Sequence, residues 1–83
     1  MYNVLLKPSA AKFIHNLPPS DAERVLRALR NLAKDPRPPG CLKLTVEEAY
    51  RIRIGRYRVL YEIDDRHKDV IVYRVKHRKD VYR

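Results

Sequence analysis

The sequence predicts an α+β fold in which two helices pack on one face of an antiparallel sheet. Residues 8–34 repeat apolar side chains at helical spacing. Residues 50–77 contain three runs rich in β-branched and aromatic residues, which favour strands. A short alternating run precedes the helices. A chain of 83 residues has room for one domain, residues 1–83, with one modest core.

The first two elements are predicted to be a strand and a helix. Within residues 2–7, Tyr2, Val4 and Leu6 recur at a spacing of two and would share one face, which is the period of a strand. From Ala10 onward, apolar residues then occur at i, i+3, i+4 and i+7, which makes one buried helical stripe. The prolines at positions 18 and 19 end this helix.

The second helix is predicted over residues 20–34. Ser20 is a candidate N-cap, and Glu23, three residues later, would complete a capping box. Apolar residues recur at helical spacing until Asp35-Pro36 stops the helix. The two helices should form a hairpin that lies on the sheet. Basic residues on the outer face of the second helix are interpreted as a solvated surface, and contact with RNA or an acidic partner is the alternative.

The rest of the chain is predicted to form strands and turns. Residues 42–45 are a weak strand candidate, and residues 46–49 are a turn or short bulge. Residues 50–54, 57–63 and 70–77 are the stronger strands. The predicted architecture is therefore an N-terminal strand, a helical hairpin and then a three- to four-stranded antiparallel sheet.

The first strand pair has a predicted register because Gly55-Arg56 fits a two-residue turn of type II′. In this register Arg53 lies opposite Arg58. Arg51 shares their face. The other face, which suits packing on the helices, carries Tyr50, Ile52, Ile54, Tyr57, Val59 and Tyr61.

Folding alone does not explain why two arginines lie opposite each other in this hairpin. Two like charges directly across a hairpin destabilise it by a few tenths of a kcal/mol up to about 1 kcal/mol. A bound phosphate would explain them, because guanidinium groups match its oxygens. Pairing with Glu47, Glu48 or Glu62 is the alternative.

The second hairpin is predicted to turn through residues 64–69, with Asp64 paired with Asp69. Arg58 then faces Val75 and Arg56 faces His77, which places His77 on the arginine face. A slip of one residue would reverse this arrangement.

Composition limits the class of protein. Lys and Arg number 19 against 10 Asp and Glu, giving a net charge of +9 and a pI near 10.1. This balance favours a polyanionic partner, nucleic acid above all. The single cysteine excludes a disulfide framework and fits a reducing compartment. No run approaches the roughly 18 apolar residues of a membrane span, and the N-terminus does not look like a signal peptide, so a cytoplasmic protein is expected.

The last eight residues carry the strongest functional signal. They place an imidazole, a guanidinium and a phenol within six positions, at His77, Arg78 and Tyr82. A hydrophobic core does not require these three side chains, whereas binding and cleavage of a phosphodiester could use all of them. Imidazole can move a proton in either direction near neutral pH. The basic face has no clustered Asp or Glu, and the sequence has no Cys/His ligand set, so neither a metal nor another cofactor is expected.

With these residues, the chain resembles the RelE toxins of the RelE/ParE superfamily. The resemblance covers nearly the whole chain and rests on the order of elements and on three motifs. They are Tyr-Arg-Ile-Arg at 50–53, Gly-x-Tyr-Arg-Val-Leu-Tyr-Glu-Ile at 55–63 and Val-Lys-His-Arg-Lys-Asp-Val-Tyr at 75–82. The His-Arg-x-Asp-x-Tyr ending is the more specific part and favours the RelE branch.

The resemblance implies the toxin of a toxin–antitoxin module. Such toxins enter the ribosomal A site, in contact with ribosomal RNA, and cut mRNA there without metal. The RNA's own 2′-hydroxyl attacks the adjacent phosphorus and leaves a 2′,3′-cyclic phosphate. A cognate antitoxin neutralises them. A ParE-like toxin that poisons gyrase, and an RNA- or ribosome-binding module without chemistry, are the alternatives.

The resemblance also implies residue roles. Arg58 matches the arginine at the scissile phosphate, Arg78 the arginine that stabilises the leaving group or transition state, and Tyr82 the tyrosine that stacks on or orients the cleaved nucleotide. Arg51 and Arg53 stand where the family often has lysines. Because arginine stays protonated, the role of general base shifts to His77 or Tyr82. The residues expected to bind neighbouring phosphates are Arg51, Arg53 and Arg56.

Overall fold

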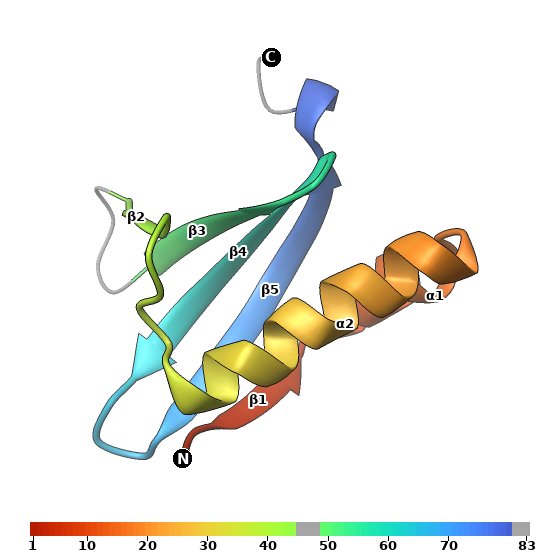
Figure 1. The fold of residues 1–83 in the computed structure, drawn as a ribbon. Coiled ribbons are helices and arrows are strands. Elements are labelled where there is room, and N and C mark those ends of the chain that lie inside the picture. The colour runs from red at the N-terminus through yellow and green to blue at the C-terminus, as the bar shows by residue number, and fades with distance from the viewer. Residues whose placement is uncertain (45–48, 81–83) are drawn as a thin grey trace.

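A five-stranded sheet with two helices on one face makes up the fold (Figure 1). The computed structural model describes residues 1–44 and 49–80. The predicted fold class is confirmed. The elements are β1 (Asn3–Leu6), α1 (Pro8–His15), α2 (Pro19–Lys34), β2 (Leu42–Lys43), β3 (Ala49–Ile54), β4 (Tyr57–Asp64), β5 (Asp69–His77) and a 3₁₀ turn at Arg78–Asp80.

The sheet has the strand order β1-β5-β4-β3-β2, so the first and last strands of the chain are neighbours. β2, β3, β4 and β5 form the predicted antiparallel part. β1 joins the edge in parallel to β5, from Asn3 opposite Asp69 to Leu6 opposite Val72. Such a parallel pair needs a long crossover, which the helical hairpin and the strands after it supply.

The start of α2 differs from the predicted capping box. The helix begins at Pro19, and no side chain caps it. Proline at the first helical position has a suitable φ and lacks the N–H group that would be left without a partner. Ser20 therefore lies inside the helix. Glu23 instead lies 3.8 Å from the guanidinium groups of Arg27 and Arg30.

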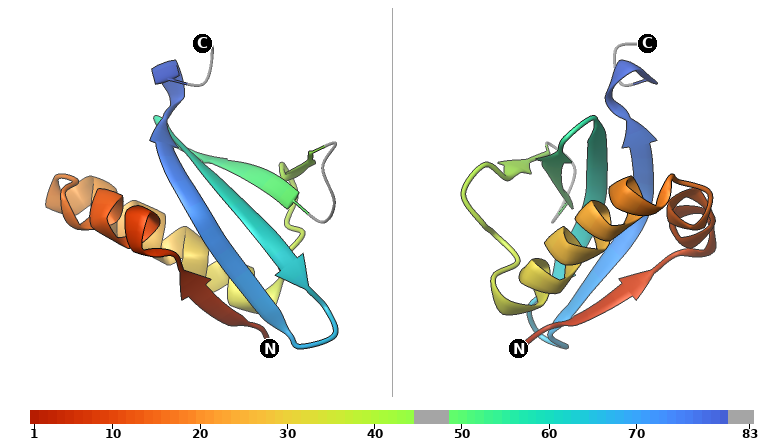
Figure 2. Two further views of the ribbon diagram at one scale, coloured as in Figure 1. Left: turned by 180° about the vertical axis from the view of Figure 1, so that it is seen from behind. Right: turned by 45° about the vertical axis from the view of Figure 1, so that its right-hand side comes forward.

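The helices cover one face of the sheet and leave the other face open, as the view from behind shows (Figure 2, left). The covered face of β3 and β4 is the one that the sequence predicts, and all six of its predicted residues are buried. Ala49 belongs to β3, although it was expected in a turn, and the remaining residues of that predicted turn, 46–48, lie outside the described part of the chain. The six buried residues are Tyr50, Ile52, Ile54, Tyr57, Val59 and Tyr61.

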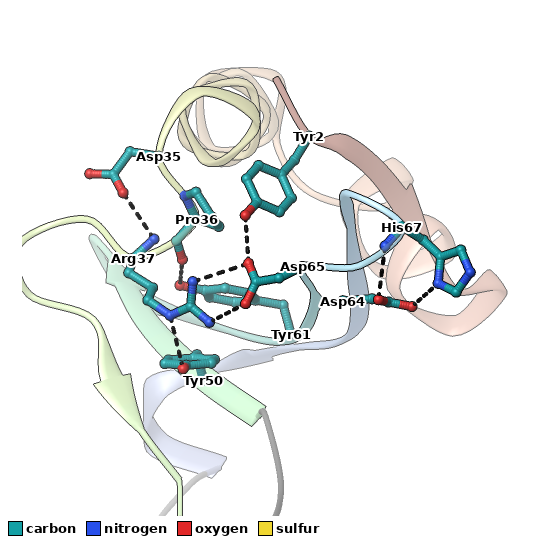
Figure 3. A network of polar contacts seen from close by, with 9 residues as sticks. All are labelled: Tyr2, Asp35, Pro36, Arg37, Tyr50, Tyr61, Asp64, Asp65 and His67. Atoms are coloured by element: carbon teal, nitrogen blue, oxygen red, sulfur yellow. Dashed lines mark hydrogen bonds and ion pairs between the residues drawn. The ribbon is translucent and has the colours of Figure 1, made fainter.

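A polar network ties the loop after α2 to the β4–β5 turn (Figure 3). Arg37 donates hydrogen bonds to the Asp65 carboxylate at 3.3 and 2.9 Å and to the Tyr50 hydroxyl at 3.0 Å. The Tyr61 hydroxyl donates to the Pro36 carbonyl at 2.7 Å. Arg37 and then Tyr2, by hydrogen bonding to the Asp65 carboxylate, hold its pKa below its usual range. This network fixes the end of the sheet opposite the β3–β4 turn.

Candidate functional site

The β3–β4 hairpin brings Arg53 and Arg58 together. They are directly opposed, as predicted. Gly55 has a φ of +58°, and Arg56 after it has no positive φ, which fits the predicted type II′ turn. Arg51 lies opposite Leu60, so it shares the open face with the two opposed arginines.

Arg58 differs from its neighbours in burial. It is only 3% exposed, whereas Arg53 is exposed and Arg51 is half-buried. Arg58 lies on β4, which has β3 on one side and β5 on the other. A guanidinium group in such a place is held within a narrow set of positions, which suits a residue that must meet one particular phosphate oxygen.

A cavity of about 370 Å³ opens beside this hairpin. Two of its lining residues, Tyr57 and Gly55, belong to the end of the hairpin. The other three are Arg53, Arg58 and Arg78. Three guanidinium groups around one hollow favour an anion with several oxygens, such as a phosphate.

His77 does not lie on the arginine face, and this prediction was wrong. A β-bulge between Leu60 and Tyr61 in the pairing of β4 with β5 shifts the register by one residue. His77 consequently lies opposite Tyr57, on the helix-covered side. Its ring packs edge-on against the Tyr57 ring, with centroids 5.5 Å apart. A single extra residue exchanges the two faces of a strand.

The same bulge places Lys76 directly opposite Arg58, where Val75 was expected. A row of three cations therefore crosses the open face, with Arg53 on β3, Arg58 on β4 and Lys76 on β5. Sequence reasoning missed Lys76 because it assumed an unbroken alternation along β5. A signal was present, since the apolar residues change from a spacing of two to a spacing of three at Val72 and Val75.

The 3₁₀ turn holds Arg78 beside the β3–β4 turn. The backbone N–H of Arg78 donates a hydrogen bond to the carbonyl oxygen of Arg56 at 2.6 Å. Arg78 and Arg56 are both exposed, and Arg78 lines the cavity. Tyr82, the fourth residue predicted to be catalytic, lies outside the described residues.

Tyr57 connects the cavity to α2. Its hydroxyl donates a hydrogen bond to Asp21 at 2.7 Å, and its ring also meets Phe13 edge-on at 6.2 Å. The hydrogen bond to the carboxylate, followed by burial, raises the pKa of the Tyr57 hydroxyl. Tyr57 therefore remains a neutral, firmly held wall of the cavity.

Within residues 1–44 and 49–80, no three His, Cys, Asp or Glu side chains gather in a group that could hold a metal ion. In the same ranges no helix has the length and apolar character needed to cross a membrane.

Known proteins of similar sequence and structure share this fold. Residues 4–82 match the family model of the ParE toxin of type II toxin–antitoxin systems, parDE. Toxin RelG of Mycobacterium tuberculosis is 37% identical over 84 residues, which cover 99% of this chain and 97% of that protein.

Two solved structures are also similar to this chain in both sequence and fold. A chain of the archaeal RelE–RelB complex from Pyrococcus horikoshii is 29% identical, with a TM-score of 0.85 and coverage of 93% of this chain and 94% of that one. A chain of the RelBE2 toxin–antitoxin complex from Mycobacterium tuberculosis is 34% identical, with a TM-score of 0.81 and coverage of 93% and 98%. The chain therefore belongs to the ParE toxin family of type II toxin–antitoxin systems and is a RelE-like toxin of that superfamily.

Proposed function

We propose that this toxin is a metal-independent endoribonuclease that cuts mRNA in the ribosomal A site and thereby inhibits translation. The observation that carries the proposal is the row of Arg53, Arg58 and Lys76 across the open face, with Arg78 at the adjoining cavity. Cations arranged in this way can hold the phosphate of an RNA chain and stabilise the charge that develops on it.

Each cation has a proposed role. Arg58, buried at the centre of the row, binds the scissile phosphate. Lys76 and Arg78 stabilise the pentacoordinate phosphorus and the departing 5′-oxygen. The ribosome aligns the RNA so that its 2′-hydroxyl attacks the neighbouring phosphorus and the bond from phosphorus to the 5′-oxygen breaks. This leaves a 2′,3′-cyclic phosphate, and the departing 5′-oxygen takes a proton from water to become a free 5′-hydroxyl. The cations that would bind neighbouring phosphates are the half-buried Arg51 and the exposed Arg53 and Arg56.

The proton from the 2′-hydroxyl needs an acceptor. Arginine remains protonated in proteins, and Lys76 acts in this scheme as a cation, so the proton passes to water. Tyr82 is a second proposed participant, through stacking on the cleaved nucleotide. His77 packs against Tyr57 on the side away from Arg58, so we assign it the support of Tyr57 in place of the proton transfer expected from the sequence.

The second proposed partner is a cognate antitoxin in the cytoplasm. Relatives of this chain have been solved as RelE–RelB and RelBE2 complexes of toxin with antitoxin. A net charge of +9 favours an antitoxin segment with acidic residues. Its association should weaken as salt rises, while the apolar part of the interface persists.

A ParE-like action on gyrase is the second candidate, because the matching family model is that of ParE toxins. Cleavage of mRNA on ribosomes separates the two. The proposed enzyme should generate new 5′ ends in a defined mRNA, and a 2′-deoxy sugar at the cut site should abolish cleavage without abolishing binding. Intact mRNA together with trapped gyrase–DNA complexes would contradict the proposal.

Arg78→Ala separates an enzyme from an RNA-binding module. Removal of one charge-stabilising donor should lower the cleavage rate by about 10²- to 10³-fold. Ribosome binding should fall far less, because the other cations still contact phosphate. Arg66→Ala is the matched control, since Arg66 is an exposed arginine in the turn at the opposite end of the sheet. Equal losses of binding and cleavage in Arg78→Ala would favour the binding module.

A further inference from the structure

A second cavity lies beside the part of β5 that extends beyond its pairing with β1. β1 pairs with β5 only as far as Val72, and the N–H of Lys7 then donates to the Val72 carbonyl at 2.9 Å as the chain turns into α1. A cavity of about 500 Å³ follows between α1 and the end of β5. Its lining residues are Ser9, Phe13, Arg74, Val75 and Lys76.

The lining combines an aromatic ring with two cations. Phe13 is half-buried, and its ring is steadied by the edge-on contact with Tyr57 at 6.2 Å. Arg74 is exposed and Lys76 is half-buried. An apolar ligand would leave the cations unused, and a simple anion would not need the ring. A nucleotide uses both, because its base stacks on an aromatic side chain and its phosphate meets the cations.

The position of this cavity relates it to the proposed site of cleavage. Lys76 lines the cavity and also lies directly opposite Arg58. Adjacent strands lie about 4.8 Å apart, so an RNA chain whose phosphate rests on Arg58 has its neighbouring nucleotide within reach of the β5 edge. The Ser9 hydroxyl is a hydrogen-bonding group in the lining that can distinguish one base edge from another.

We infer that the cavity between α1 and β5 binds the base of a nucleotide adjoining the cleaved phosphate, with Phe13 as the stacking surface, and so contributes to the sequence preference of cleavage. The inference rests on the proposed function, of which it names the specificity-determining residue.

Phe13→Leu tests the inference, because leucine retains apolar packing against Tyr57 and removes the stacking surface. Cleavage rates are measured at many sites of one mRNA on ribosomes. The rate at the preferred sites should fall by about 5- to 150-fold relative to the others, the range expected for one base–aromatic stack. Lys12→Ala, an exposed change on the same helix, should leave the distribution unchanged. A purely structural role of Phe13 would lower all sites alike and would overturn the inference.

A measurement of RNA binding tests the base-binding cavity separately from the proposed cleavage of mRNA. Short single-stranded RNAs that differ in one base and carry 2′-O-methyl sugars are titrated with the intact protein and with Phe13→Leu. A base preference that Phe13→Leu abolishes supports the cavity even if cleavage is never observed. If the wild type cleaves mRNA but Phe13→Leu shows the same distribution of cut sites, the cavity inference is wrong and the proposed function stands.

Discussion

Replacing Lys76 and His77 one at a time tests the assignment of the site most directly, because the two residues are adjacent in sequence and lie on opposite faces of β5. Lys76→Ala removes a cation beside the buried Arg58. At about 4 Å from a phosphate, one unit charge contributes ~4 kcal/mol at an effective dielectric constant near 20. Solvent at the half-buried Lys76 reduces this value, so a loss of about 10²- to 10³-fold in cleavage rate is expected.

His77→Gln should have a much smaller effect. It keeps a polar side chain next to Tyr57, and the cations of the open face remain in place. Less than a tenfold change in the rate is expected, since no charge near the phosphate is lost. Both variants are assayed by single-turnover cleavage on mRNA-programmed ribosomes, with Arg66→Ala as the control for the loss of one positive charge. A larger loss in His77→Gln than in Lys76→Ala would refute the reasoning from the register.

Two further predictions concern stability. Tyr61→Phe should lower the free energy of unfolding by about 1–3 kcal/mol, because the buried Pro36 carbonyl loses its donor; an unchanged urea midpoint would contradict this. Asp65→Asn should reduce the loss of unfolding free energy that occurs as the pH falls into the acid range. Arg37 lowers the pKa of Asp65, so its stabilisation is present above the unfolded pKa of about 3.9 and is lost as pH falls below it. Circular dichroism at low salt measures the effect, and a wild-type acid limb in Asp65→Asn would count against it.

The first hairpin could be predicted in full because a two-residue turn leaves no freedom in register. The pairing of Arg53 with Arg58 follows directly from Gly55-Arg56. Other features depend on competition or on distant contacts. At the start of α2, two prolines outcompeted Ser20 as the helix boundary, because a proline at the first turn is already restricted to a helical φ. The parallel pairing of β1 with β5 joins segments more than 60 residues apart, and no local pattern encodes it.

The burial of Arg58 illustrates a further limit of local reasoning. Its sequence neighbours predict only which face it occupies. Its exposure depends on the side chains of the strands on either side, which a single strand's pattern does not reveal. The motif therefore proposes the arginine, and the sheet adds that Arg58 is buried whereas Arg53 is exposed.

The bulge in β5 is a requirement of the core, and the position of Lys76 follows from it. Val70, Val72 and Val75 are all buried, yet the last two are three residues apart. A regular strand would bury only residues of one parity, and Val75 would then face solvent. One extra residue, Tyr73, which has no partner in the ladder, lets Val75 lie opposite Val59 in the core. Lys76 then lies directly opposite Arg58, at the edge of β5 that also borders the cavity beside α1. The apolar spacing that satisfies the core thus also completes the row of cations on the open face.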